Sequence, residues 1–263
     1  MRDFHVFIEQ QGEQIYVGKI TGSGSEEAVF SYAQEYLDNP SSCPISIHLP
    51  FQAQNFSAEE TRLFFEGLLP EGFTRKCVAG WIHADEYDYL TILAALGREC
   101  LGAIQIIEDG IDVPKAGYQK LTKEDVCRLA KEGASEAAEL VTKAHLSLTG
   151  ASGKVGLYYK IDTNEWYLPI GAAPSTHIVK QSHVRLDGIV TNEQLCLQTA
   201  KNLGIDVPDS FVINVGTGKD EEVLFATHRY DRIIDEKCRV MDGLTVPFRL
   251  HQEDFSQAMG ISS

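Results

Sequence analysis

A glycine-spaced segment followed by a lysine-ended strand constrains this chain more than any other feature. Residues 147–156 read Ser-Leu-Thr-Gly-Ala-Ser-Gly-Lys-Val-Gly, and a later apolar stretch, Thr-His-Ile-Val, ends at Lys180. Glycine lets a backbone approach phosphate closely, because a side chain there would collide or exclude a positive φ. A lysine at the end of an apolar strand adds a positive charge to the same phosphates. The order of these parts predicts a nucleotide-binding lobe of the kinase type.

The pattern upstream of that lobe predicts an N-terminal domain of mixed strands and helices over residues 1–115. Alternating apolar residues favour a hairpin at 4–20, and Ser57 and Glu60 form a capping box where a helix starts. The other elements expected in this part are a helix at 26–38, a strand at 43–49, helices at 73–81 and 86–96, a strand at 103–107 and a linker at 108–117.

The remainder, residues 116–263, is expected to hold an antiparallel kinase-type sheet with flanking helices. The expected elements are helices that start at Thr122 and, through a Thr-x-x-Gln box, at Thr191, and strands within 153–180, at 211–215 and at 223–226. In the second helix, Leu195, Ala200 and Leu203 are expected to face inward. The predicted fold class is therefore α+β.

The composition fits a packed protein of the cytoplasm. Hydrophobic residues make up 43% of the 263 residues, and no apolar run approaches the ~20 residues of a membrane span. Six scattered cysteines, with no CxxC pair and no export signal, indicate reduced thiols. A formal charge of −15 argues against direct DNA binding, because such a surface repels the phosphate backbone. It suits docking to a basic protein, or serves solubility alone.

Lys180 and Glu193 are the first pair of candidate site residues. In a kinase lobe, a glutamate on the helix after the lysine strand orients the lysine through an ion pair. Glu193 lies early in the predicted helix, so we expect an N···O distance of about 4 Å or less. The alternatives are a solvated lysine at a strand end and a glutamate that merely complements the helix dipole.

Other catalytic and metal motifs fail at identifiable positions. A Walker A loop would need glycine at position 148 and Ser or Thr at 155, where the chain has Leu148 and Val155. A nucleophile elbow would need one more residue between Ser152 and Gly153. The eight histidines lack metal-ligand spacing, so we predict no metal site from them.

Several motifs, in order along the chain, resemble the HipA toxin kinases. The matching segments are 64–72, 96–104, 147–155, 174–180, Asn192-Glu193, Tyr-Asp-Arg at 230–232 and 249–260. The resemblance covers essentially the whole chain. HipA-like proteins are bacterial serine/threonine kinases that act as toxins and are held by a small DNA-binding antitoxin, HipB. Their known substrate type is an aminoacyl-tRNA synthetase.

The resemblance implies ATP and magnesium as cofactors and assigns roles to individual residues. The implied ATP-binding residues are Gly150, Ala151, Ser152, Gly153, Lys154, Lys180, Glu193, His228, Arg229 and Tyr230. Ser147 corresponds to a serine whose autophosphorylation expels the loop, and Thr149 is a nearby hydroxyl that could share this role. About two added negative charges beside a phosphate site would oppose ATP binding.

The resemblance also implies that catalytic groups lie beyond this sequence. In the family, the catalytic aspartate, its downstream asparagine and the magnesium-binding aspartate belong to a helical lobe after the segment matched by 249–260, and this sequence ends at Ser263. We therefore expect a chain that is inactive alone, with an incomplete magnesium site. The alternatives are a regulatory module that pairs with a separate kinase lobe or antitoxin, and an unrelated acidic α+β binding protein.

Overall fold

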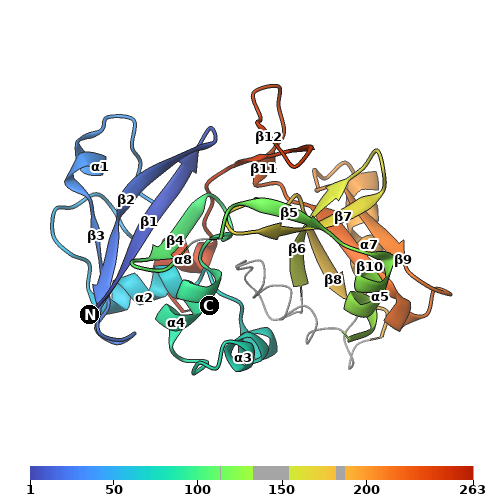
Figure 1. Cartoon of the computed structure of the whole chain (residues 1–263), viewed down its shortest axis with the longest axis horizontal. Helices are drawn as coiled ribbons and strands as arrows, with labels where there is room; N and C mark the ends of the chain where they lie inside the picture. The colour runs from blue at the N-terminus through green and yellow to red at the C-terminus, as the bar shows by residue number, and fades with distance from the viewer. Residues whose placement is uncertain (113, 133–153, 182–186, 263) are drawn as a thin grey trace.

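The computed structural model describes residues 1–112, 114–132, 154–181 and 187–262. Two large antiparallel sheets stand side by side, with helices packed on their faces (Figure 1), and two short ribbons of two strands each accompany them. One continuous hydrophobic cluster runs through both halves, so the predicted N-terminal and kinase-type parts share a core. None of the helices within the described ranges combines the length and apolar character that a membrane span requires.

The first sheet has the strand order β3-β2-β1-β4. Its strands are β1 (Arg2–Gln10), β2 (Glu13–Gly22), β3 (Val29–Tyr32) and β4 (Ile104–Glu108). β1 and β2 form the predicted hairpin, and the turn residues Gln11 and Gly12 have φ values of 51° and 84°. Positive φ at both central positions gives the turn a twist that matches the strands. Phe4, Val6 and Ile8 alternate along β1 and are buried in the core.

The predicted helix over 26–38 is wrong. This segment forms β3 followed by a short helix, α1 (Gln34–Asp38). β3 pairs with β2, which places Phe30 opposite Ile20, and both side chains are buried. Helical spacing of apolar residues predicted the wrong structure here, because pairing with an existing hairpin decides the conformation of so short a segment.

The predicted strand over 43–49 is also wrong, because this segment has no ladder partner. The hydroxyl of Tyr32 accepts a hydrogen bond from the N–H of Ile45 (3.0 Å) and donates one to the carbonyl of Leu49 (2.6 Å). One buried side chain thereby satisfies backbone groups that a neighbouring strand would otherwise take.

The other predicted helices of the first half are confirmed. They are α2 (Ala58–Glu66), α3 (Gly72–Trp81) and α4 (Tyr89–Leu96). At the start of α2, the hydroxyl of Ser57 accepts from the N–H of Glu60 (3.2 Å), and the Glu60 carboxylate accepts from the N–H of Ser57 (2.8 Å). This is the predicted capping box, and it satisfies two amides that a helix start leaves without partners.

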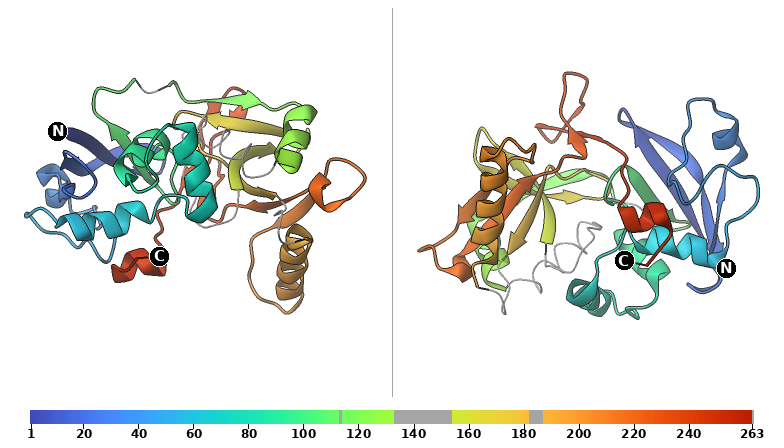
Figure 2. Two further views of the ribbon diagram at one scale, coloured as in Figure 1. Left: turned by 90° about the horizontal axis from the view of Figure 1, so that it is seen from below. Right: turned by 180° about the vertical axis from the view of Figure 1, so that it is seen from behind.

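The second sheet has the order β5-β7-β6-β8-β10-β9. Its strands are β5 (Gly117–Lys120), β6 (Lys154–Lys160), β7 (Glu165–Ile170), β8 (His177–Gln181), β9 (Ser210–Asn214) and β10 (Val223–His228). Helix α5 (Lys123–Glu132) buries Leu129 on the face that carries Leu157 and Leu224. Helix α7 (Ile189–Asn202) packs Val190 against Phe225 on the opposite face (Figures 1 and 2).

Helix α7 departs from two predictions. It begins at Ile189 after Gly188, whose φ is 71°, so the Thr191 box does not cap it. Leu195 and Leu203 are 64% and 75% exposed, so they do not face inward. Only a narrow side of α7 contacts the sheet. The spacing of apolar residues along the helix could not show that its remaining surface lacks a neighbour among the described residues.

The chain crosses from the first sheet to the second between Glu108 and Gly117, within the predicted linker. The remaining elements are η1 (Asp220–Glu222), β11 (Arg232–Ile233), β12 (Val240–Met241), β13 (Leu244–Thr245), β14 (Phe248–Arg249) and α8 (Phe255–Met259). Helix α8 returns to the first half and lies beside α2 (Figure 2), where the side-chain amide of Gln257 donates to the carbonyl of Phe64 at 2.9 Å.

Candidate functional site

Lys180, at the end of β8, and Glu193, in the second turn of α7, form the expected ion pair. Their Nζ and Oε1 atoms are 2.6 Å apart, and the side chains are 24% and 34% exposed. Lys180 Nζ also lies 5.6 Å from the ring centroid of Phe225, on the face of the sheet that α7 covers. Strand and helix together hold the ammonium group in one position at a partly open surface.

Lys154 supplies a second positive charge next to Lys180. The two lysines are directly paired across β6 and β8, so their side chains share one face of the sheet. Burial, and after it the charge of Lys180, lowers the pKa of Lys154 to about 8, while the carboxylate of Glu71 at the start of α3 opposes this shift. Glu193 and Glu71 balance the two lysines, and the two neighbouring ammonium groups on one face of the sheet are donors that suit the oxygens of a polyphosphate.

The glycine loop lies outside the described residues. The predicted positions concerned are Ser147, Thr149, Gly150, Ala151, Ser152 and Gly153. The structure therefore brings together Lys154, Lys180 and Glu193 from the predicted set, and the loop residues remain predictions.

Three of the implied ATP-binding residues, which we call the hinge, are His228 at the end of β10 and Arg229 and Tyr230 directly after it, and their surroundings differ. The imidazole of His228 contacts that of His177 at 5.3 Å between ring centroids, on the face away from Lys180. Arg229 is 1% exposed and its guanidinium is occupied by internal partners, whereas Tyr230 is 68% exposed. Neither the His228 ring nor the Arg229 guanidinium is directed to the lysine face, so the main chain and the Tyr230 side chain are what this segment can offer a ligand.

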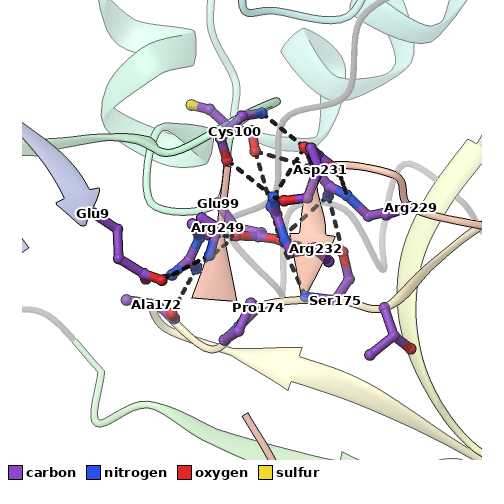
Figure 3. A network of polar contacts seen from close by, with 12 residues as sticks. Glu9, Glu99, Cys100, Ala172, Pro174, Ser175, Arg229, Asp231, Arg232 and Arg249 are labelled. Atoms are coloured by element: carbon purple, nitrogen blue, oxygen red, sulfur yellow. Dashed lines mark hydrogen bonds and ion pairs between the residues drawn. The ribbon is translucent and has the colours of Figure 1, made fainter. Parts of the chain in front are cut away.

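A buried group of charges, which we call the arginine–carboxylate cluster, occupies the junction of the two halves (Figure 3). Its six members are Glu9, Glu99, Asp231, Arg229, Arg232 and Arg249. Three carboxylates face three guanidinium groups, so the cluster is neutral. It links β1 and the turn between α4 and β4, in the first half, to the segment after β10 and to β14.

Glu99 is the centre of this cluster. Its carboxylate accepts from Arg232 (2.8 Å), Arg249 (2.6 Å) and Arg229 (3.3 Å). Burial alone would raise the pKa of the Glu99 carboxyl, but the charges of Arg232, Arg249 and Arg229 outweigh burial and hold that pKa well below its usual range. The carboxylate also accepts from the N–H of Ser175 (3.1 Å), just before β8.

The sequence did not predict the cluster, although several of its residues belong to the motifs that carry the family resemblance. Asp231, Arg232 and Arg249 drew attention only through the family resemblance. A pattern signal did exist, since Arg229, Asp231 and Arg232 follow directly after a buried strand, but partners that lie far apart in sequence could not be matched to one another.

The described residues do not form a metal site. Among them, no group of three or more His, Cys, Asp or Glu side chains could hold a metal ion. The lysine pair fits the phosphates of a nucleotide, whereas magnesium finds no set of ligands in the described part of the chain, so no step is assigned to it below.

Comparison with known proteins identifies relatives over most of the chain. The sequence profile of the HipA N-terminal domain matches residues 11–107, and that of the HipA-like C-terminal domain matches residues 146–263. A protein of Sinorhizobium fredii named "Putative kinase Y4mE" is 32% identical over 254 residues, which cover 93% of this chain and 57% of the relative. The serine/threonine-protein kinase toxin HipA of Shewanella oneidensis is 26% identical over 220 residues, or 83% of this chain and 47% of that protein.

A solved structure confirms the fold. A chain in the complex of HipA, HipB and operator DNA from Shewanella oneidensis matches with a TM-score of 0.73 at 22% identity, covering 97% of this chain and 56% of that one. This chain thus spans about half the length of the curated relatives it matches.

Proposed function

Because the chain belongs to the HipA family, we propose that it forms the ATP-binding part of a serine/threonine protein kinase of the toxin–antitoxin type. The observation that carries the proposal is the Lys180–Glu193 ion pair at 2.6 Å with Lys154 on the neighbouring strand. A strand lysine oriented by a helix glutamate is the arrangement with which kinases hold the phosphates of ATP.

In this proposal, each part of the site has its own task. The Lys180 ammonium binds the phosphates while Glu193 keeps it in place, and Lys154 adds the second positive charge. The loop from Gly150 to Gly153 approaches the phosphates through its backbone. The main chain at Tyr230 meets the edge of the adenine ring, because hydrogen bonds to a base need groups held at fixed positions.

Regulation and partners are part of the same proposal. Ser147, with Thr149 beside it, is the autophosphorylation site, where a phosphate would repel ATP. The partner is a HipB-like antitoxin or a separate C-terminal kinase lobe, and an aminoacyl-tRNA synthetase is the substrate of the complete enzyme. The solved relative was crystallised with HipB and DNA, which supports the antitoxin.

Calorimetric titration with Mg-ATP tests the nucleotide site. We expect measurable binding to the unaltered chain and about tenfold weaker binding to Lys180→Ala, since a charged hydrogen-bond donor to phosphate is lost. Lys120→Ala is the matched control, because Lys120 forms a comparable pair with Glu165 on the same sheet. Equal affinities in all three proteins, or no binding to any, would contradict the proposal.

Phosphoryl transfer is tested separately. With labelled ATP, we expect no sustained transfer by the 263-residue chain and transfer once a C-terminal HipA-type lobe is supplied. Mass spectrometry of the complemented sample then locates the phosphate at Ser147 or Thr149. Sustained transfer by the chain alone would disprove its proposed inactivity while leaving the nucleotide site in place.

A further inference from the structure

We infer that the arginine–carboxylate cluster positions the hinge of the nucleotide site from the N-terminal half, with Glu99 and Asp231 as positioning residues. The inference rests on the proposed function and goes beyond it, since it gives the N-terminal half a direct part in nucleotide recognition. Neither residue belongs to the set that the family resemblance assigns to ATP.

The hinge is held on both sides of Tyr230. Arg229 and Asp231 are 1% and 3% exposed, whereas Tyr230 between them is 68% exposed. The N–H of Arg229 donates to the carbonyl of Thr176 (2.9 Å), and the carbonyl of Asp231 accepts from the N–H of Leu250 (2.9 Å). Within the described part of the chain, no hydrogen bond engages the main-chain groups of Tyr230, so they stay available on a fixed frame.

The side chain of Asp231 connects the hinge to the first half of the molecule. Its carboxylate accepts from Arg229 (2.7 Å) and Arg232 (2.9 Å), and also from the N–H of Gly102 (2.8 Å) in the turn before β4. A carboxylate with three such partners has little freedom to move. The hinge is therefore tied to the first half of the molecule through the buried side chain of Asp231, and the guanidinium of Arg229 adds a hydrogen bond to the carbonyl of Cys100 (3.3 Å).

Glu99 adds a tie to the lysine strand. It accepts from the N–H of Ser175 (3.1 Å), and Ser175 also accepts from Arg229 (3.0 Å) through its hydroxyl. Glu99 thus sets the start of β8 relative to the hinge. The two lysines, by contrast, are held together by the ladder between β6 and β8, which does not depend on the cluster.

This separation makes the inference testable, because the base and the phosphates of a nucleotide depend on different parts of the fold. Disturbing the cluster should displace the hinge and weaken contacts to adenine, while the lysine pair continues to bind polyphosphate. A purely structural role would instead weaken both ligands in proportion to the loss of folded protein.

The experiment compares Mg-ATP with inorganic tripolyphosphate on folded protein, well below the unfolding temperature. For Asp231→Asn we expect the dissociation constant for ATP to rise about tenfold, the effect of one or two lost hydrogen bonds, and that for tripolyphosphate to stay within about twofold. Glu108→Gln is the matched control, since it neutralises a carboxylate that pairs with an arginine, Arg2, in the first half but outside the cluster, and it should change neither constant.

Ser175→Ala provides a milder variant in case Asp231→Asn does not fold, and it should weaken ATP more than tripolyphosphate. Equal losses for the two ligands, or an equal loss of ATP binding in Glu108→Gln, would overturn the inference and leave the proposed function standing. An unaltered chain that binds neither ligand would overturn both.

Discussion

The carboxylate of Glu99 and the guanidinium of Arg249 lie 2.6 Å apart, although 150 residues separate them in the sequence. Both side chains are almost fully buried. The pair joins the turn before β4 to β14, near the other end of the chain. Since Arg249 also contacts Glu9 of β1, the last part of the sequence completes the charge balance of the first.

Replacing Glu99 with glutamine should destabilise the protein strongly. The variant leaves three buried guanidinium groups facing two carboxylates, and breaking a buried ion pair on one side costs about 3–5 kcal/mol. Urea denaturation measures the change. The control, Glu165→Gln, removes a carboxylate from an exposed pair with Lys120 and should shift the midpoint far less. Equal shifts would show that the buried cluster contributes no more to stability than an exposed ion pair does.

The two predicted helix caps should respond in opposite ways to alanine. Ser57→Ala removes a hydroxyl that accepts from the N–H of Glu60, and loss of such a cap costs about 1 kcal/mol. Thr191→Ala changes a residue inside α7, two positions after its first residue, where alanine is the better helix former, so stability should stay constant or rise slightly. Thermal unfolding of both variants checks this, and a loss in Thr191→Ala would contradict the observed start of α7.

Stability should fall as the pH drops from about 6.5 to 4. Burial, and after it the neighbouring His228, lowers the pKa of His177 to about 4. The unfolded chain therefore takes up a proton in this range before the folded chain does, and protonation favours unfolding. The stabilising effect is complete above the unfolded pKa and is lost as the pH falls.

Denaturant titrations at several pH values measure this slope. In His177→Phe the slope should become shallower, because phenylalanine keeps the ring contacts with Tyr159 and Trp166 but does not titrate. His83→Asn is the control, since His83 is exposed and asparagine tolerates its φ of 53°. An unchanged slope in His177→Phe would assign the acid sensitivity to other groups.

Local patterns predicted much of the fold correctly. The β1–β2 hairpin, the capping box of α2 and the strands around Lys180 follow from alternation, caps and turns within a few residues. The errors arise where a partner outside the segment determines its conformation. β3 is a strand because it pairs with the edge of β2, and residues 43–49 stay irregular because the Tyr32 hydroxyl forms hydrogen bonds with their backbone.

The candidate site likewise has one part that the sequence predicts and one part that it does not. Lys180 and Glu193 are 13 residues apart, in a strand and the next helix, so their meeting could be predicted from the order of elements. The cluster around Glu99 joins residues 76 to 150 positions apart, and no local pattern matches such partners. The sequence also could not show that the His228 ring lies on the face opposite Lys180, because this depends on its register against His177.

The return of β14 and α8 to the first half has a consequence for synthesis on the ribosome. Glu99 cannot meet Arg249 until 150 more residues have been polymerised, which takes roughly eight to thirty seconds at about 5–20 residues per second. The amino-terminal half therefore leaves the exit tunnel with its central carboxylate incompletely neutralised, and its maturation awaits translation of β14.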